Sequence, residues 1–375
     1  MRIFAWNGHD QYDRLLVATL SESRILMEKG IDQYRQEDYC IGNDCYFLAS
    51  EKGRFFSPIP GLDYAFGFRE GPRYGEELPA DDPDRFLRYR LVPFEQTELL
   101  EADRLLGGIC GDVAGSRYEY MNIESIDEAD LAASPCTYTD ETLLIAAVAA
   151  ALSQGLDRTG PDWLKSAHKK EELQESVRRY LKFIGSLDPY RGFDDRFFRW
   201  LENGRPYASD RGDAACRAAP AGWFAKSLPE ALELARLVSE VSHTSKAALA
   251  GAQVIAGSIY LLRKGASPEE IRRFAGKYYP GDFKYEKGGL AGTFDPAASV
   301  VVPAALAAFL AADSYAGALK KAIELGGDSD SIASLAGSLA ETVFPVPEYL
   351  RRRTVSTLPA PLARALYTAI RQTEN

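Results

Sequence analysis

The sequence feature that most constrains the fold is a glycine pair followed by acidic and hydroxyl side chains and then by a long apolar run. Gly326-Gly327-Asp328-Ser329-Asp330-Ser331 leads directly into small and apolar residues that continue to Ala340. Glycine permits a sharp turn and a close backbone approach, and the apolar spacing that follows is helical. The stretch therefore predicts a tight turn that opens a buried helix. Carboxylates at such a position are also ordinary helix caps, which is the simpler interpretation of this hexapeptide alone.

The composition is that of a globular protein. Of the 375 residues, 46% are hydrophobic and 26% are charged, which leaves room for one or two domains. The net charge of −10 argues against nucleic-acid binding through bulk charge, although it leaves room for a local basic patch. The apolar stretches at 143–152 and 297–312 are too short or too broken to cross a membrane. The first ten residues also lack the apolar core of a signal peptide, so we expect a cytoplasmic protein with no membrane partner.

The cysteines indicate reduced, mostly buried thiols rather than a disulfide framework, because their number is odd and they are scattered. No second pair of cysteine or histidine residues stands at zinc-site spacing. The five are Cys40, Cys45, Cys110, Cys136 and Cys216.

The first part of the chain differs from the rest, because it is rich in aromatic residues and interrupted by turn signals. We predict a small α+β module with strands at 15–19 and 45–49 and a short helix at 23–29. Its aromatic residues are more simply its own core than a platform for stacking bases. Residues 71–84 contain three prolines and two glycines and form the best linker candidate. We therefore divide the chain into an accessory module, 1–90, and a second domain, 91–375.

The second domain is predicted to be a compact all-α bundle, which makes the protein mainly α. Apolar residues recur there at i, i+3 and i+4, alanine is abundant, and glycine or proline marks the joints. The expected helices cover 95–115, 139–154, 171–186, 194–204, 228–243, 246–264, 268–276, 296–312, 315–324, 329–343 and 361–372.

Two further motifs carry acidic residues in apolar surroundings. In the first, 107–119, glycines leave a smooth helix face, and Asp112 lies inside an apolar helix where it needs donors, a cation or a sugar as partner. Glu119 follows in a loop and, taken alone, is an ordinary surface residue. In the second, Thr139-Asp140-Glu141 opens another apolar helix. These residues alone could simply be helix caps.

Together, the helix starts at residues 139 and 328 predict a metal site. If both helices are buried and their starts meet, four carboxylates come together, and they cannot all ionise without a positive charge between them. Ligand sets made only of oxygen favour hard cations such as Mg²⁺, Mn²⁺ or Ca²⁺. Two such clusters make a binuclear site plausible, with the ions about 3.5–4 Å apart.

At this point the chain resembles the ADP-ribosylglycohydrolase family. The resemblance rests on Gly-Asp-x-x-Gly-Ser-x-Tyr-Glu, Tyr-Thr-Asp-Glu-Thr and Gly-Gly-Asp-Ser-Asp-Ser in this order, from about residue 104 to the C-terminus. It implies an all-α fold with two Mg²⁺ ions, or Mn²⁺, that bind the ribose of ADP-ribose. It also implies an enzyme that cleaves the glycosidic bond between ADP-ribose and an acceptor, such as a modified protein.

The resemblance also implies roles for individual residues. The metal ligands would be Thr139, Asp140, Glu141, Asp328, Asp330 and Ser331. Glu119 and Asp330 would be catalytic, and Asp194 or Asp195 is a less favoured choice of base. The substrate-binding residues would be Asp112, Gly115, Ser116, Gly212 and His243, although His243 could instead cap a helix C-terminus. The chain departs from the family at Glu141, usually Asp, at Ser331, often Thr, and at Asp213, often a neutral residue.

Two other functions remain open at this stage. One is a binding protein that has kept the fold, for example an ADP-ribose-binding or immunity-type protein that blocks a toxin through its N-terminal module. The other is a metal-dependent phosphoesterase, which the chain favours less because it has only three histidines.

Overall fold

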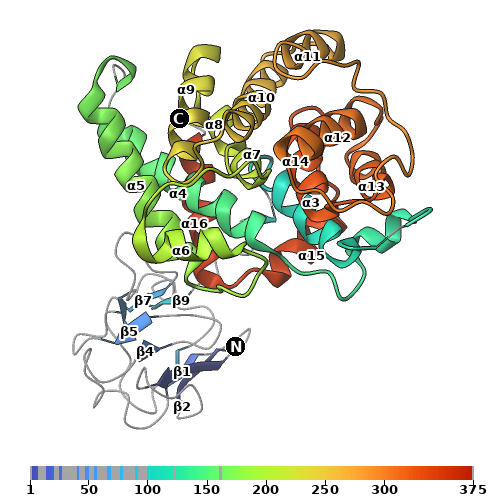
Figure 1. Ribbon diagram of the computed structural model, residues 1–375. Helices are drawn as coiled ribbons and strands as arrows, with labels where there is room; N and C mark the ends of the chain where they lie inside the picture. The colour runs from blue at the N-terminus through green and yellow to red at the C-terminus, as the bar shows by residue number, and fades with distance from the viewer. Residues whose placement is uncertain are drawn as a thin grey trace. The chain divides into compact units, whose positions relative to one another are not determined.

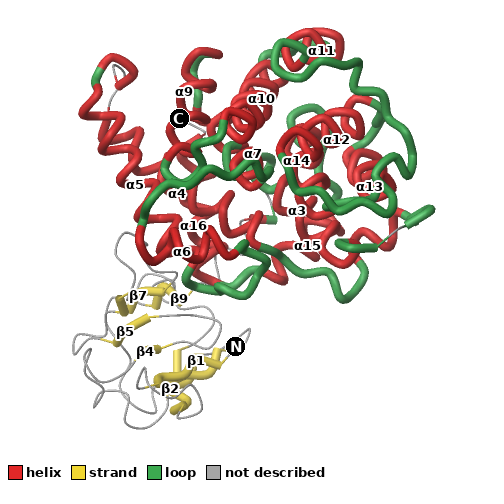
Figure 2. The backbone as a smooth tube through the Cα atoms, viewed as in Figure 1, coloured by secondary structure: helices red, strands yellow, loops and turns green. Residues whose placement is uncertain are grey.

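The computed structural model describes residues 99–100, 102–121, 123–159 and 163–373, and within the first 98 residues it describes nine short strands. The chain divides into two compact units (Figures 1 and 2). Unit 1 comprises residues 1–99 and 358–367, and unit 2 comprises residues 100–357 and 368–375. The boundary predicted between residues 90 and 91 stays a prediction.

The described part of residues 1–98 forms two antiparallel sheets. The larger has the strand order β6-β5-β4-β1-β2-β3-β8, and the smaller pairs β7 with β9. The strands are β1 (Arg2–Trp6), β2 (Arg14–Leu20), β3 (Ile25–Met27), β4 (Cys40–Ile41), β5 (Phe47–Ala49), β6 (Phe55–Phe56), β7 (Phe66–Phe68), β8 (Glu77–Leu78) and β9 (Tyr89–Leu91).

The strand predicted at 15–19 is confirmed as β2, and that at 45–49 is confirmed over Phe47–Ala49 as β5, but the helix predicted at 23–29 is wrong. That segment contains β3, which pairs with β2 from Leu20 opposite Ile25 and with β8 on its other side. Sheet pairing therefore outweighs the local helical pattern. The predicted linker 71–84 is wrong at Glu77–Leu78, which is β8, and the rest of it lies outside the described residues.

Unit 2 is helical, which confirms the predicted mainly α class. Its helices are α3 (Gly107–Gly115), α4 (Asp140–Thr159), α5 (Ala167–Gly185), α6 (Asp195–Asn203), α7 (Asp213–Cys216), α8 (Ala219–Phe224), α9 (Leu228–Glu240), α10 (Lys246–Arg263), α11 (Pro268–Ala275), α12 (Ala298–Leu310), α13 (Tyr315–Leu325), α14 (Ser329–Ala340) and α15 (Glu348–Thr357). Helix α16 (Ala360–Thr373) is divided between the units, and the short 3₁₀ helices are η2 (Ser116–Tyr118), η3 (Glu128–Ala132) and η4 (Trp163–Lys165). None of the described helices has both the length and the apolar character needed to cross a membrane.

Serine side chains explain where many of these helices begin. Each accepts a hydrogen bond from the backbone N–H three residues ahead, which satisfies one of the unpaired donors of a helix N-terminus. The capping residues are Ser166, Ser227, Ser245, Ser267 and Ser314, before α5, α9, α10, α11 and α13.

Helix α14 forms the centre of unit 2, and all of its residues are buried. It packs against α3, α12 and α13 (Figure 1). The contact with α3 is made by backbone atoms, since a Cβ placed on Gly107 would lie 2.5 Å from the carbonyl oxygen of Gly337. The smooth glycine face predicted for the first motif therefore serves close helix packing.

Two details differ from the predicted helices. Within the helix predicted over 95–115, α3 begins at Gly107, because residues 102–106 are not helical and Leu105 has a left-handed backbone, with φ 62°. Leu99 is helical, and residues 95–98 and 101 lie outside the described residues. The helices α7, α8 and α15 were not predicted. The first two are short, at four and six residues, and have little hydrophobic periodicity to reveal them.

Candidate functional site

The two acidic helix starts lie next to each other. Ser331, in the first turn of α14, donates a hydrogen bond of 2.5 Å from its hydroxyl to Oε1 of Glu141, in the first turn of α4. Both residues are buried, and they are 190 positions apart in the sequence. The structure thus brings together the two motifs on which the predicted metal site depends.

Asp112 holds the start of α4 in place. Its carboxylate accepts hydrogen bonds from the backbone N–H groups of Thr139 (2.9 Å) and Thr142 (3.2 Å) and from both threonine hydroxyls. These donors are the partners that a fully buried carboxylate needs. Burial nevertheless raises the pKa of Asp112 to about 7, and the nearby charge of Asp330 contributes. Because its oxygens are occupied in this way, Asp112 positions α4 rather than facing open space.

Three carboxylates converge where α14 begins. One oxygen from each of Glu119, Asp328 and Asp330 lies within 4.8 Å of the others, which is an arrangement that could hold a metal ion. Glu119 is half-buried and directly follows η2. Burial, and then the charge of Asp330, raise the pKa of Glu119 to about 7. This group gathers the predicted catalytic residues Glu119 and Asp330 with the predicted ligand Asp328.

Asp140 and Glu141 form a second acidic group at the start of α4. Both are buried, and burial raises the pKa of each well above the usual value, as do neighbouring carboxylates that include Asp213 and Asp330. Oε2 of Glu141 is buried and has no hydrogen-bond partner. Thr139 precedes them, and its hydroxyl donates to Oδ1 of Asp112 at 2.5 Å.

The donor set fits a hard divalent cation. The carboxylates and hydroxyls at the two helix starts all offer oxygen, and buried carboxylates with raised pKa values are those that a nearby positive charge would ionise. The unpartnered Oε2 of Glu141 is a buried acceptor that a cation would satisfy. A bound cation would therefore reduce the repulsion among these carboxylates and also give Oε2 of Glu141 a partner.

Arg211, in the loop before α7, was not among the predicted site residues. Its Nε lies 3.2 Å from Oδ1 of Asp213, in the loop before α7, and it donates a hydrogen bond there. Asp213 is buried, so its negative charge, noted in the sequence as unusual, is matched by a cation two residues away. An arginine in a segment otherwise made of small residues was the available signal.

The other predicted substrate-binding residues have structural contacts. Gly115 is needed for helix packing, because a Cβ there would lie 2.5 Å from the carbonyl oxygen of Ser329. The hydroxyl of Ser116 accepts from the N–H of Thr137 at 3.1 Å, and the N–H of Gly212 donates to the carbonyl of Pro296 at 2.8 Å.

His243 is fully buried beside Asp213, with Nε2 4.0 Å from Oδ2 of that residue. Burial holds the pKa of His243 well below its usual value, and the charge of Arg217 adds to this effect. His243 follows the C-terminus of α9, and its N–H donates to the carbonyl of Ser239 at 2.9 Å, so the alternative role at the helix C-terminus stays a prediction. The histidine is therefore a neutral, buried neighbour of the acidic groups.

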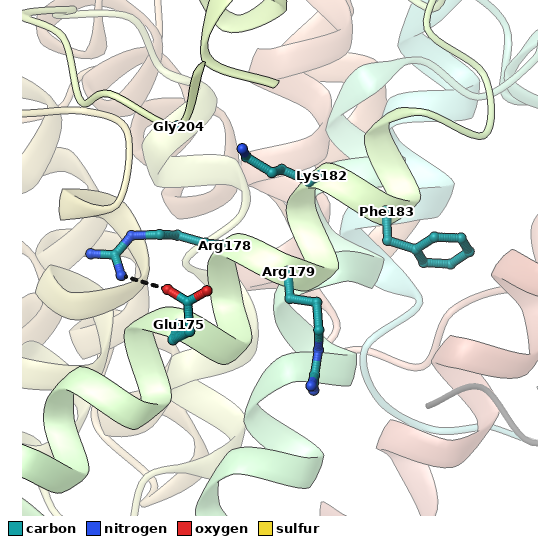
Figure 3. A pocket seen from close by; sticks show the side chains of 6 residues that line it. All are labelled: Glu175, Arg178, Arg179, Lys182, Phe183 and Gly204. Atoms are coloured by element: carbon teal, nitrogen blue, oxygen red, sulfur yellow. Dashed lines mark hydrogen bonds and ion pairs between the residues drawn. The ribbon is translucent and has the colours of Figure 1, made fainter. Parts of the chain in front are cut away.

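A separate pocket lies on α5 and has different chemistry. It has a volume of about 450 Å³ and is lined by Glu175, Arg178, Arg179, Lys182, Phe183 and Gly204 (Figure 3). Its single carboxylate, Glu175, pairs with Arg178 at 3.1 Å. This basic pocket lacks the converging carboxylates of the site described above.

Comparison with known proteins agrees with this geometry. The profile of the ADP-ribosylglycohydrolase family matches residues 102–370. A protein of Archaeoglobus fulgidus described as uncharacterized is 27% identical over 281 residues, which cover 65% of this chain and 88% of that protein. A solved structure described as an ADP-ribosylglycohydrolase-related protein complex is similar in fold, with a TM-score of 0.50 and 22% identity, over 74% of this chain and 99% of that chain.

The family match spans more than half of the chain and includes every carboxylate described above. It supports a glycohydrolase-type enzyme that acts on ADP-ribose linkages. The chain belongs to the ADP-ribosylglycohydrolase family.

Proposed function

We propose that the protein hydrolyses the glycosidic bond between the ribose C1″ of ADP-ribose and a modified acceptor, which would reverse ADP-ribosylation. The observation that carries this proposal is the convergence of Glu119, Asp328 and Asp330 beside the contact between Ser331 and Glu141. The acceptor would be an ADP-ribosylated protein or another ADP-ribosylated molecule.

The proposed cofactor is Mg²⁺, with Mn²⁺ as an alternative. When bound, it would supply positive charge that orients the 2″ and 3″ hydroxyls of the ribose. Asp328 and Asp330 would hold one ion, with Glu119 beside it. Thr139, Asp140, Glu141, Asp330 and Ser331 are the proposed ligands of a second. Magnesium suits this set because it favours carboxylate and hydroxyl oxygens.

Glu119 is the proposed general base. It extends from the loop after η2 and is only half-buried, so water can reach it, whereas Asp328 and Asp330 are buried. A pKa of about 7 suits a group that takes a proton from water near neutral pH. Asp330 would lie near the ribose and stabilise the positive charge that develops on it as the glycosidic bond breaks.

Exchanging Asp328 or Asp330 for asparagine tests the proposal. Asp328→Asn and Asp330→Asn keep the side-chain shape but remove a negative charge, so release of ADP-ribose should fall by at least about 100-fold. The assay would measure Mg²⁺-dependent release from a panel of ADP-ribosylated acceptors.

The matched control is Asp313→Asn, since Asp313 is an exposed carboxylate before α13. It should keep wild-type turnover. Turnover close to wild type in both site variants, with all proteins folded by circular dichroism, would end the proposal.

A further inference from the structure

The segment between α5 and α6, residues 186–194, lies against the start of α4. The backbone N–H of Asp140, the first residue of α4, donates a hydrogen bond of 2.9 Å to the carbonyl oxygen of Arg191. This bond satisfies one of the N–H groups that a helix N-terminus leaves without a partner inside the helix. It joins the α5–α6 segment to the chain at a residue that is a proposed cation ligand.

The side chain of Arg191 holds the same two stretches of chain together. Its Nε donates to Oδ2 of Asp188 at 2.5 Å, and its Nη1 donates to Oγ1 of Thr137 at 3.1 Å. Its guanidinium lies over the ring of Tyr138, 4.2 Å from the centroid, and the hydroxyl of Tyr138 donates to Oδ2 of Asp188 at 2.9 Å. A guanidinium can make these contacts at once because its donors are fixed in a planar fork whose face also attracts an aromatic ring. Arg191 therefore ties the α5–α6 segment to the residues that precede Asp140.

Gly192 leaves the space in which the carboxylate of Asp140 lies. A Cβ added at Gly192 would be 2.5 Å from Oδ1 of Asp140, and the backbone there has φ 119°, which favours glycine. Because Asp140 is buried, the added methyl group would displace an oxygen that has little free space around it. The position of that carboxylate therefore depends on the absence of a side chain at residue 192.

We propose that Arg191 and Gly192 are positioning residues that hold the carboxylate of Asp140 where it can bind the cation. Arg191 fixes the backbone at the start of α4 from the α5–α6 segment, as Asp112 does from α3. Gly192 gives the carboxylate its place. Residues that orient a metal ligand in this way typically change metal affinity by about 10- to 100-fold when they are exchanged. The inference rests on the proposed function for the role of Asp140 as a cation ligand.

Mn²⁺ binding to the full-length protein, measured by isothermal titration calorimetry and by electron paramagnetic resonance of the free ion, tests this inference. Asp140→Asn identifies the Mn²⁺ equivalent that depends on Asp140. Arg191→Met removes the donors of that side chain but keeps much of its length, so this equivalent should bind at least about tenfold more weakly. Gly192→Ala should weaken the same equivalent, because its methyl group displaces Oδ1 of Asp140. Arg191→Lys keeps a positive charge near the ring of Tyr138, so its affinity should lie between those of wild type and Arg191→Met.

Each variant has a matched control. Arg178→Met removes an arginine of α5 whose side chain is 26% exposed, against 31% for Arg191, and which also pairs with a carboxylate, Glu175, at 3.1 Å. Gly281→Ala introduces a side chain at a similar backbone conformation, φ 147°, where an added Cβ would have no atom of the described residues within 4 Å. Both controls should keep the wild-type Mn²⁺ affinity.

The outcomes separate this inference from the proposed function. A wild-type Mn²⁺ affinity in folded Arg191→Met or Gly192→Ala, together with weaker binding in Asp140→Asn, would overturn the role of that residue and leave the proposed function standing. A wild-type affinity in Asp140→Asn would overturn the inference as well, because Asp140 would then be no ligand. If the affinities change as expected but wild-type protein releases no ADP-ribose, the inference stands and the proposed function fails.

Circular dichroism shows which variants fold. If only one of Arg191→Met and Gly192→Ala folds, that variant decides. If neither folds, Arg191→Lys decides, and a wild-type affinity in it would overturn the inference.

Discussion

Glu341, at the end of α14, is a buried carboxyl group that fastens the start of α3. Its Oε2 accepts from the N–H of Gly107 at 2.7 Å, and its Oε1 accepts from Nε1 of Trp223 at 3.2 Å. Burial raises the pKa of Glu341 to about 8, although these hydrogen bonds act in the opposite direction. This carboxyl group therefore carries a proton in the folded protein at pH values where the unfolded chain has lost it.

The sign of the resulting pH dependence follows from proton binding. Between about pH 4.5, where the unfolded carboxyl ionises, and about pH 8, the folded state binds the extra proton, so this group makes stability fall as the pH rises. We expect the free energy of unfolding to fall less steeply with pH in Glu341→Gln than in wild-type protein. Urea unfolding at pH 5, 6.5 and 8 with a chelator present measures the difference.

Comparison with wild-type protein isolates Glu341, because other buried carboxyls contribute equally to both. Glu348→Gln, which changes an exposed carboxyl at the start of α15, serves as control and should keep the wild-type slope. Parallel slopes for Glu341→Gln and wild-type protein would contradict the assignment of a raised pKa.

At the scale of elements, the crossing of α3 and α14 depends on glycine. A Cβ on Gly111 would overlap the backbone carbonyl of Ala333, and backbone atoms cannot move aside as a flexible side chain can. We expect Gly111→Ala to lower the free energy of unfolding by about 2–3 kcal/mol or more. The measurement is urea unfolding at a fixed pH.

Gly185→Ala is the matched control, since Gly185 ends α5 and an added Cβ meets only the side chains of Leu201 and Phe193, at 3.1 Å or more. Alanine has the higher helix propensity, by about 1 kcal/mol, so this exchange should be nearly neutral or stabilising. An unchanged free energy of unfolding in Gly111→Ala would mean that α3 and α14 can move apart without a loss of stability.

The elements show which structural features the sequence could predict. The starts of α9, α10 and α11 were predicted correctly because serine caps and apolar spacing mark them locally. Helices α7 and α8 were missed because their short length leaves too few residues for a periodic pattern. Strand β3 was predicted as a helix because pairing with β2 and β8 is a property of the assembled sheet.

The residues of the candidate site likewise divide into those that the sequence could predict and those that it could not. The acidic helix starts could be recognised because carboxylates beside apolar runs must be buried, and a buried carboxylate needs a partner. Asp112 was correctly expected to find such a partner. The partners of Arg211 could not be read from the sequence, because one of them, Asp194, comes from the start of α6.

For the molecule as a whole, we propose that residues 1–90 form an accessory module and 91–375 the catalytic domain. If the second holds a divalent cation, the ion binds the folded chain and not the unfolded one. Saturating Mg²⁺ should therefore raise the free energy of unfolding, by about 2.7 kcal/mol at 100 times its dissociation constant. Thermal unfolding in Mg²⁺ and in a chelator measures this gain.

Asp328→Asn should lose most of this stabilisation, because Asp328 is one of the three converging carboxylates. Asp313→Asn should retain it. An equal gain in both variants would show that Mg²⁺ acts elsewhere on the protein.

The contact between Ser331 and Glu141 has a consequence for how the protein is made. The ribosome adds residue 141 long before residue 331, so a growing chain has only part of the proposed cation ligands until α14 has been synthesised. Until then, the carboxylates of α4 have neither the ion nor the serine hydroxyl as partner. The nascent chain therefore completes the proposed centre only after α14 has been synthesised, and a cation could favour that chain but not its earlier fragments.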